Sequence, residues 1–511
     1  MSNLEAYPQA ETADICILLE GTYPFLPGGV SNWVYELIRA FPEYTFAAIF
    51  LGTRAEDYKG LVYSLPSNVV HFQPYYLFEA APITAHNNQH IDTKSMQCVR
   101  SMHDKFLNIM TPQEEPITEI YQLLLDPHCP VDETFFLRSR ASWELLLEKY
   151  RQHHADESFF DYFWGIRNLH RPFWKLASIV QELPICKLLH SASTGYAGFL
   201  GALLQKKYQL PYVLTEHGIY TKERWIDLMR NYFFEEAVKE GKSFDMQHGL
   251  LAIWMRFFSI LGKLSYDAAN PVISLFEGYR QRQIQDGACA DRTKIISYGI
   301  DFNRYSFLNK PGPSMTNPVI ACIGRVVPIK DIKTFIRACA VVIQEKPETE
   351  AWIIGSMKED QEYVTTCQSL IKILGLENKI KLLGSQDVMD IYPKIDLLLL
   401  SSISEGSPFV MLESMAVGIP VIATDVGGCS ELIYGKSEED KALGVAGRLV
   451  NMADPRSLAE ATLELLTNKA AWCAAQKAGL ARVRAYYGMQ RLIQEYGDIY
   501  KDAIDHGGYR I

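Results

Sequence analysis

Residues 396–424 read DLLLLSSISEGSPFVMLESMAVGIPVIAT, and this stretch decides the fold. It opens with an apolar run, 396–402, of the kind that forms a buried parallel strand. Apolar residues then recur at helical spacing until Gly418 and Pro420 end the helix. A second apolar run, 421–424, follows. This order of strand, loop, helix and strand predicts a parallel α/β sheet, and such sheets bind ligands beyond the carboxyl ends of their strands.

Two carboxylates flank the turn in this stretch. Glu405 lies in the loop after the strand, and Glu413 lies within the helix. Helix N-termini attract phosphate, but a carboxylate repels it, so both glutamates are expected to accept hydrogen bonds from hydroxyls. The pattern fits a nucleotide sugar, with Glu413 on the ribose and Glu405 on the transferred sugar. The simpler alternatives are an exposed helix glutamate for Glu413 and a capping residue for Glu405.

A second loop of the same half carries two cations. A strand ends at Gly324, and Arg325 and Lys330 follow five residues apart. A planar guanidinium and an ammonium both suit a diphosphate. The alternative is a pair of solvated surface cations. The glutamate loop favours the diphosphate interpretation, because both loops follow strands of one predicted sheet.

The first half offers weaker candidates. Gly28 and Gly29 form a strand-to-helix turn, where glycines let backbone N–H groups approach a ligand. His217 follows another strand, and it is expected to donate a hydrogen bond to a sugar or phosphate. A structural histidine is equally compatible with the sequence. His190 occupies the equivalent place after a further strand, with less support.

Composition excludes several classes of function. The 511-residue chain has a net charge of −10, which argues against nucleic-acid binding. Its ten cysteines lack metal-ligand spacing. The N-terminus lacks the features of a signal peptide, and no apolar run is long enough to span a bilayer. A cytoplasmic protein is therefore expected.

Strand and helix patterns divide the chain into two halves. Apolar runs predict strands near 14–19, 46–51, 69–72, 187–190, 212–215, 272–274 and 294–297, and in the second half near 319–323, 351–354, 380–383, 397–400 and 421–423. Residues from about 85 to 185 are aromatic and mostly helical in period, and we interpret them as an insertion in the first half. Residues 308–318, rich in Pro, Gly and Ser, form the expected linker.

The motifs of the second half resemble those of the family 4 retaining glycosyltransferases. The glutamate stretch resembles the E-x7-E signature of that family. Gly324-Arg325 with Lys330 resembles its G-R-x-x-x-x-K element. Residues 298–301 resemble its N-G-V-D turn, with Tyr298 in place of Asn. Ser407 departs from the Phe found in many relatives, which puts the shape of the donor-sugar pocket in doubt.

The resemblance implies a GT-B fold, in which two Rossmann-like domains with parallel sheets face each other across a cleft. The expected domains are an acceptor domain at 1–307, a donor domain at 319–489, and a terminal helix at 490–511 that crosses back to the first domain. The expected catalytic residues are Glu405, Arg325, Lys330 and His217. The expected nucleotide-sugar contacts are Arg325, Lys330, Glu405, Gly406, Ser407, Pro408, Phe409, Val410, Glu413, Gly28 and Gly29.

The family resemblance also implies a reaction. A sugar would pass from a donor, expected to be UDP-linked, with retention of configuration and without metal or cofactor. The N-terminal stretch 19–33 and the aromatic insertion resemble the PelF glycosyltransferases of Pel exopolysaccharide synthesis. This implies a polysaccharide acceptor and, as partners, inner-membrane polysaccharide synthase or transport proteins that recruit the chain to the inner face of the membrane.

Three alternatives to this reaction remain open from the sequence. The first is a nucleotide-sugar epimerase with the same fold. The second, from a different class, is a catalytically silent UDP-sugar sensor within a secretion complex. The third is an enzyme that resembles glycogen synthase and makes a soluble glucan. The complete set of Arg325, Lys330 and two glutamates argues against the sensor, because binding alone would not need all of it.

Overall fold

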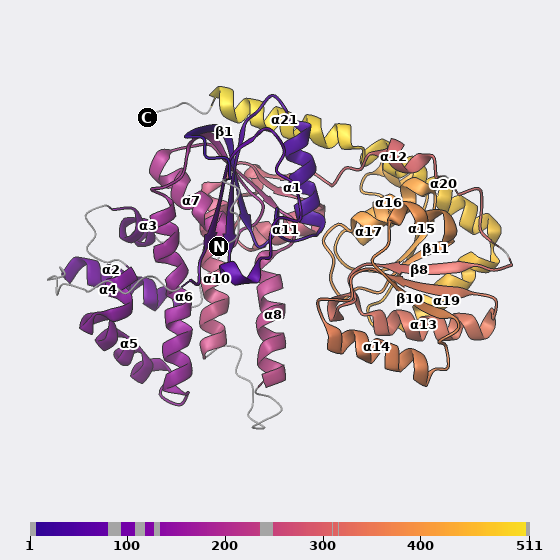
Figure 1. Cartoon of the computed structure of the whole chain (residues 1–511), viewed down its shortest axis with the longest axis horizontal. Coiled ribbons are helices and arrows are strands. Elements are labelled where there is room, and N and C mark those ends of the chain that lie inside the picture. Colours follow the sequence, from indigo (N-terminus) through magenta and orange to yellow (C-terminus); the bar gives the residue numbers. More distant parts are fainter. Residues whose placement is uncertain are drawn as a thin grey trace. The chain divides into compact units, whose positions relative to one another are not determined.

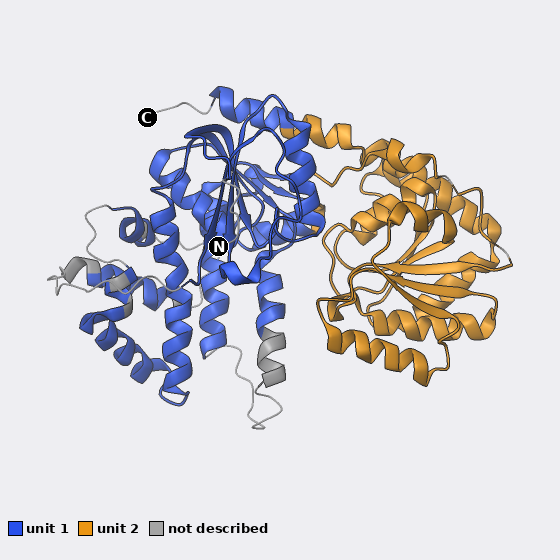
Figure 2. Ribbon diagram, viewed as in Figure 1, with its two compact units in different colours: residues 1–274, 279–294, 497–511 blue, residues 275–278, 295–496 orange. Residues whose placement is uncertain are grey.

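The computed structural model describes residues 7–79, 93–107, 118–126, 133–235, 249–308, 310–314 and 316–506. Within these ranges the chain forms two compact units (Figure 2). Unit 1 comprises residues 1–274, 279–294 and 497–511, and unit 2 comprises residues 275–278 and 295–496. Each unit is a parallel sheet with helices on both faces (Figure 1).

Unit 1 contains a seven-stranded sheet in the order β3-β2-β1-β4-β5-β6-β7. Its strands are β1 (Thr12–Glu20), β2 (Phe46–Gly52), β3 (Val69–Tyr76), β4 (Ile185–Ser191), β5 (Tyr212–Glu216), β6 (Val272–Ser274) and β7 (Thr293–Ile295). The helices that flank it are α1 (Gly29–Ala40), α7 (Tyr196–Tyr208), α8 (Tyr220–Glu235), α10 (Leu250–Ala268) and α11 (Glu277–Gln285). β2 is buried along its whole length, as expected for a strand covered by helices on both faces.

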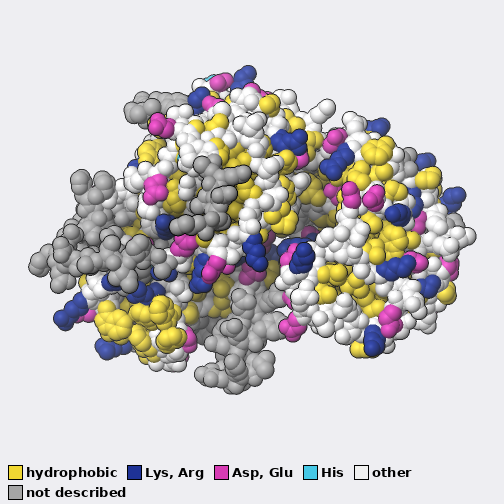
Figure 3. All heavy atoms as spheres, viewed as in Figure 1, with side chains coloured by type: hydrophobic (Ala, Val, Ile, Leu, Met, Phe, Trp, Pro, Cys, Tyr) yellow, Lys and Arg dark blue, Asp and Glu magenta, His cyan; other side chains and the backbone are white. Residues whose placement is uncertain are grey.

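Five further helices of unit 1 fall within the aromatic stretch predicted as an insertion. They are α2 (Thr93–Leu107), α3 (Thr118–Leu125), α4 (Glu133–Arg138), α5 (Arg140–His153) and α6 (Phe159–Ile179). Parts of that stretch, 85–92, 108–117 and 127–132, lie outside the described residues. Many of the aromatics are core, among them Tyr162, Phe173 and Trp174. Others remain exposed, and hydrophobic side chains gather over α5 and α6 (Figure 3).

Unit 2 contains a six-stranded sheet in the order β10-β9-β8-β11-β12-β13. Its strands are β8 (Val319–Ile323), β9 (Glu350–Ile354), β10 (Ile380–Gly384), β11 (Leu397–Leu400), β12 (Val421–Thr424) and β13 (Gly447–Val450). Its helices are α12 (Phe302–Ser306), α13 (Ile332–Glu345), α14 (Gln361–Ile373), α15 (Val388–Ile391), α16 (Phe409–Val417), α17 (Cys429–Tyr434), α18 (Glu438–Lys441), α19 (Pro455–Thr467) and α20 (Lys469–Tyr486).

The strand order places the candidate loops together. In both sheets the order reverses direction next to the first strand of the unit, between β1 and β4 in unit 1 and between β8 and β11 in unit 2. Doubly wound sheets bind ligands at such a switch point. The loop with Arg325 follows β8 and the loop with Glu405 follows β11, so both predicted loops meet at the switch point of unit 2.

The structure adds detail at two of the expected boundaries. Residues 308–318, expected as a linker, lie inside unit 2 where they are described; residues 309 and 315 are outside the described residues. This stretch is anchored because Lys310 Nζ pairs with the buried carboxylate of Asp396 at 2.9 Å. The division between the units also falls within α21 (Met489–His506), whose residues from Gly497 onward belong to unit 1.

Candidate functional site

The loop after β8 brings the two predicted cations into different environments. A short 3-10 turn, η3 (Pro328–Lys330), leads into α13, and the Asp331 carboxylate caps that helix by accepting from Thr334 N. Arg325 is exposed and makes no ion pair with any residue that the structure describes. Lys330 is folded back over the neighbouring loop. Arg325 is therefore available to an external anion, whereas Lys330 already has a partner.

That partner is Glu405. Lys330 Nζ lies 2.5 Å from Glu405 Oε1, and Ser402 Oγ donates to the same oxygen. The Glu405 side chain is only 9% exposed, so the ion pair is partly shielded from water. A backbone bond from Ile403 N to Ile329 O ties the two loops together at 2.9 Å. The structure thus joins the two motifs that the sequence placed 75 residues apart.

Glu405 does not cap the helix that follows it, which removes one of the simpler interpretations. The N-cap residue of α16 is Pro408, and no side chain accepts from the first turn. The first N–H groups of a helix have no acceptor within the helix, so those of Phe409 and Val410 can bind an anion. The Phe409 ring stacks on the buried Tyr298 at 4.1 Å, which fixes the start of the helix.

A glycine is required where the β12–α17 loop crosses the glutamate loop. Gly427 has a φ of +58°, and a Cβ built on it would lie 2.1 Å from Glu405 O. The next residue, Gly428, donates its N–H to Gly406 O at 2.8 Å. The Glu405–Gly406 backbone is therefore held by a close contact that no larger residue permits.

Glu413 lies about one turn into α16, between two tyrosines. Tyr392 donates to Oε2 at 2.7 Å and Tyr305 donates to Oε1 at 3.0 Å. Burial raises the pKa of the Glu413 carboxyl, although the two tyrosine hydroxyls and Arg304 act to lower it. Glu413 is thus not a simple exposed helix glutamate, since both of its oxygens are already oriented by hydroxyl donors.

The candidate residues of unit 1 form a separate group. Gly28 precedes α1 as its N-cap, and Gly29 begins that helix; both are exposed. Trp33, on the same helix, packs edge-on against His217 with ring centroids 4.3 Å apart. Burial lowers the pKa of His217 to about 3, with a smaller contribution from His190. His217 is therefore a neutral imidazole near neutral pH, able to donate one hydrogen bond.

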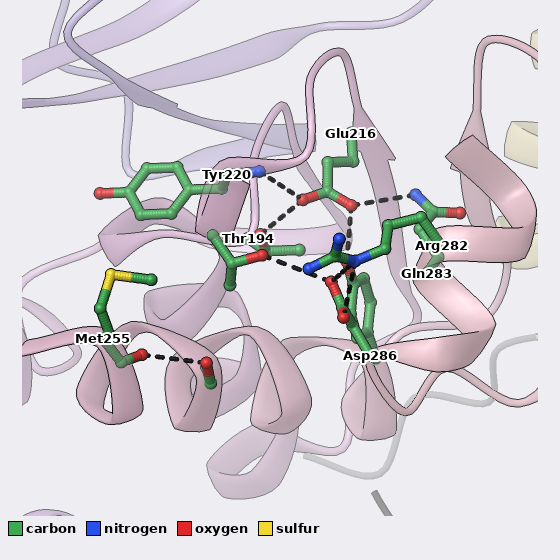
Figure 4. A network of polar contacts seen from close by, with 10 residues as sticks. Thr194, Glu216, Tyr220, Met255, Arg282, Gln283 and Asp286 are labelled. Atoms are coloured by element: carbon green, nitrogen blue, oxygen red, sulfur yellow. Dashed lines mark hydrogen bonds and ion pairs between the residues drawn. The ribbon is translucent and has the colours of Figure 1, made fainter. Parts of the chain in front are cut away.

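Glu216 fixes the backbone immediately before His217. This carboxylate is fully buried and accepts from Thr194 Oγ1, Tyr220 N and Gln283 Nε2, the last at 3.0 Å (Figure 4). Tyr266 donates a fourth bond at 2.6 Å. Because every oxygen is satisfied within the fold, Glu216 is a structural group that holds the loop after β5.

His190 has a structural role as well. Its Nδ1 lies 2.7 Å from the Tyr500 hydroxyl and its Nε2 lies 2.9 Å from Thr215 Oγ1. Both ring nitrogens are engaged inside unit 1, which leaves neither for a substrate. The weaker of the two histidine candidates is thereby set aside.

Several residues at the unit 2 site were not anticipated. Tyr305 and Tyr392 orient Glu413, and Ser402 orients Glu405. Tyr298 had been noted only as a departure from a motif, and it supports Phe409. Only Tyr298 and Ser402 lie within a recognisable motif. The hydroxyls on Glu413 come from positions 108 and 21 residues away, and no local pattern indicates them.

Two family models match the chain. The model described as "Domain of unknown function (DUF3492)" matches residues 13–291, and "Glycosyl transferases group 1" matches residues 317–468. The second match covers the loops with Arg325, Lys330, Glu405 and Glu413.

Curated relatives are similar over part of the chain. A lipopolysaccharide core biosynthesis mannosyltransferase, LpsB of Rhizobium meliloti, is 25% identical over 219 residues, which cover 41% of this chain and 61% of that protein. N-acetyl-alpha-D-glucosaminyl L-malate synthase of Bacillus anthracis is 27% identical over 194 residues, 38% of this chain and 48% of the synthase. The chain thus spans about half the length of the curated relatives it matches.

Solved structures share the whole fold. Anabaena HepE in complex with UDP aligns with a TM-score of 0.57 at 17% identity, covering 96% of this chain and 100% of HepE. Sucrose-phosphate synthase from Thermosynechococcus elongatus aligns with a TM-score of 0.56 at 16% identity, covering the same shares. The two parallel sheets of seven and six strands make this a GT-B fold, and the fold class predicted from the sequence is confirmed.

Proposed function

Since the chain belongs to the DUF3492 family and continues into a group 1 glycosyl transferase domain, we propose that it is a retaining glycosyltransferase that uses a nucleotide-sugar donor. One observation carries the proposal. At the switch point of unit 2, the Lys330–Glu405 pair and the uncapped start of α16 are held together by backbone contacts, beside Arg325, which pairs with none of the described residues. Cations and helix N–H groups around one point suit a diphosphate.

Each group then has a proposed role. Arg325 and Lys330 bind the diphosphate and stabilise the charge that develops on it as it leaves. The N–H groups of Phe409 and Val410 bind the same group, with the backbone of Gly406, Ser407 and Pro408 shaping the turn. Glu405 holds the donor sugar and stabilises positive charge at its anomeric carbon. Glu413 accepts hydrogen bonds from the ribose diol.

In the proposed step, the bond between the anomeric carbon and the phosphate oxygen breaks. A bond from an acceptor hydroxyl forms on the same face of the sugar, and the hydroxyl proton passes to the departing phosphate. No separate protein base is required. In unit 1, His217 donates a hydrogen bond to substrate as a neutral imidazole, and the exposed backbone at Gly28 and Gly29 adds N–H donors.

The donor and acceptor are proposed from the relatives. HepE, which shares the fold, was solved with UDP-glucose, and this supports a UDP-linked hexose or N-acetylhexosamine. The resemblance of residues 19–33 to PelF supports a growing exopolysaccharide of the Pel type as acceptor. An exopolysaccharide phosphotransferase of Streptomyces coelicolor is 34% identical over 164 residues, 32% of this chain and 16% of that protein. We propose a cytoplasmic location, with recruitment by inner-membrane polysaccharide synthase or transport proteins.

Calorimetric titration of the full chain with UDP, ADP and GDP, followed by turnover assays with a panel of UDP-sugars, tests this function. We expect UDP to bind, and one UDP-sugar to release UDP only when a saccharide acceptor is present. Arg325→Ala should abolish turnover, while the exposed Arg456→Ala on α19 should retain it. Full activity of Arg325→Ala would exclude the assigned role. Binding without turnover would indicate a sensor, and a modified sugar released without acceptor would indicate an epimerase.

A further inference from the structure

Helices α4, α5 and α6 take no part in the proposed chemistry, yet they carry an unusual surface. Phe160 and Trp164 lie one turn apart on α6 and are 69% and 46% exposed. Their rings contact each other edge-on, with centroids 6.3 Å apart. A surface helix normally turns its large apolar side chains toward the core. Exposed aromatics that gather on one face mark a site of interaction.

A third exposed aromatic extends this surface onto the neighbouring helix. Trp143 of α5 is 45% exposed and packs against Phe159 and Phe163 of α6, with centroids 5.8 and 5.7 Å apart. Figure 3 shows hydrophobic side chains gathered over α5 and α6, with basic side chains beside them. We refer to Trp143, Phe160 and Trp164 as the aromatic patch.

An arginine-lined pocket adjoins the aromatic patch. It has a volume of about 390 Å³, and Trp143 and Phe163 form part of its wall. Arg138, Arg140 and Arg167 also line it. Thus the same tryptophan belongs to both the apolar patch and the cationic pocket.

The arginines of this pocket differ in their surroundings. Burial lowers the pKa of Arg167, and the nearby Arg171 and Arg138 lower it further. Arg140 pairs with Glu144 at 2.7 Å, and Arg171 pairs with Glu133 at 3.4 Å.

The exposed Arg138 has no ion pair with any residue in the described ranges, so positive charge remains for an external anion. The Arg167 guanidinium lies over the rings of Phe163 and Trp164, at 5.1 and 5.8 Å from their centroids. This holds the charge at the boundary of the aromatic patch.

We propose that the aromatic patch and the arginine pocket form a docking surface for an anionic phospholipid membrane. Tryptophan and phenylalanine enter the interface between headgroups and acyl chains, and arginine binds lipid phosphates. A soluble anion would fill the pocket but leave the aromatic patch uncovered. No helix in the described part of the chain is long and apolar enough to cross a bilayer, so attachment would be at the surface. This inference does not depend on the proposed transferase activity.

Co-sedimentation of the full chain with protein-free vesicles tests the proposal. Vesicles of phosphatidylcholine alone should bind it weakly, and vesicles that also contain phosphatidylglycerol should bind it more tightly, with the difference reduced by salt. Phe160→Ala combined with Trp164→Ala should weaken binding about tenfold or more, because two interfacial anchors are lost. Arg138→Gln should reduce the preference for anionic vesicles.

Matched controls separate docking from folding. Ile373→Ala removes an 80% exposed apolar side chain from α14 of unit 2, and Arg456→Gln removes an exposed arginine from α19; both should bind vesicles as the unsubstituted chain does. The patch variants should keep their thermal unfolding midpoint. Equal binding to neutral and anionic vesicles, or binding that survives loss of both aromatics, would overturn the proposal. Binding to native membranes but not to protein-free vesicles would also overturn it, because the partner would then be a protein.

Discussion

Removing the hydroxyl of Tyr392 tests how Glu413 works. In the structure Tyr392 and Tyr305 each donate to one oxygen of this carboxylate, at 2.7 and 3.0 Å. Tyr392 is fully buried, so Tyr392→Phe removes one hydrogen bond without opening a cavity. If the ribose diol binds Glu413, the carboxylate in this variant is no longer held in place for it, and nucleotide affinity falls.

The magnitude follows from the kind of bond. A hydrogen bond to a charged group contributes about 1.5–3 kcal/mol. Part of this free energy goes into holding the Glu413 carboxylate in position for the ribose. We expect the dissociation constant for UDP to rise about tenfold in Tyr392→Phe, equivalent to about 1.4 kcal/mol. In the double variant with Tyr305→Phe, the loss of UDP affinity should be smaller than the sum of the losses in the two single variants, because both hydroxyls act on the same carboxylate.

The pH dependence of UDP binding provides a second readout of the same variant, with an expected direction. Burial raises the pKa of Glu413, and the tyrosine hydroxyls act against that rise. The ionised carboxylate is the better acceptor, so UDP affinity should fall as the pH drops through this raised pKa. In Tyr392→Phe the fall should begin at a higher pH. For stability the sign is opposite: a raised native pKa stabilises the fold below the unfolded-state pKa, and this contribution disappears as the pH rises through the native one.

Isothermal titration with UDP over a pH series measures both effects. Tyr23→Phe is the matched control, because the Tyr23 hydroxyl is buried in unit 1 without a hydrogen-bond partner in the described part of the chain. That variant should bind UDP normally. If Tyr392→Phe also binds UDP normally, with an unchanged pH profile, then the assignment of Glu413 to the ribose is wrong.

Three further predictions concern the framework of the site. Arg482→Met should lower the stability of the fold by about 3–5 kcal/mol, because it leaves the fully buried Asp440 without its partner at 2.6 Å; thermal unfolding measures this. Gly427→Ala should weaken UDP binding tenfold or more, because its Cβ would displace the Glu405 backbone. His217, with its pKa lowered to about 3, should contribute no ionisation to a rate profile between pH 5 and 8. It should instead destabilise the fold as the pH falls from about 6.5 toward 3, where the unfolded chain binds more protons.

Controls and contrary outcomes are available for each. Arg456→Met, on the exposed face of α19, should leave the unfolding midpoint unchanged. Gly488→Ala has open space around the new Cβ and should bind UDP normally. Equal midpoints for Arg482→Met and Arg456→Met, or normal UDP binding by Gly427→Ala, would contradict the structural roles described. A pH limb near neutrality that disappears in His217→Gln would show that this histidine is charged during catalysis.

The sequence predicts the fold class well because its strands are continuous apolar runs. β1, β2, β8, β11 and β12 all fall where such runs were identified. β13 was missed. It is a four-residue edge strand, GRLV, whose middle residues are only half-buried, so it lacks the continuous apolar pattern.

Residues 308–318, expected as a linker, belong to unit 2 where they are described. Proline and glycine at 308–318 indicate irregular backbone, but they do not indicate whether that backbone is packed. Several long-range contacts hold the stretch against unit 2, among them the buried Lys310–Asp396 ion pair, the bond from Ser314 N to Asp396 and the bond from Gln476 to Lys310 O. Such contacts leave no local trace in the sequence.

The same limit applies to the candidate site. The motifs indicate Arg325, Lys330, Glu405 and Glu413 because they are contiguous patterns. They do not indicate that Lys330 is paired with Glu405, whereas Arg325 has no ion pair within the described ranges. Replacing Lys330 should therefore have a different effect from replacing Arg325, because only the loss of Lys330 leaves the partly buried Glu405 carboxylate without its ion pair.

The most direct test of the central claim is a titration of UDP into three forms of the full chain: unsubstituted, Arg325→Ala and Arg456→Ala. Arg325 is exposed and unpaired among the described residues, so its removal should leave the unfolding midpoint unchanged. We predict equal UDP affinity for the unsubstituted chain and Arg456→Ala, and at least about tenfold weaker binding for Arg325→Ala. Equal affinity for all three forms, or binding of ADP where UDP does not bind, would contradict a UDP-sugar site in the loops after β8 and β11.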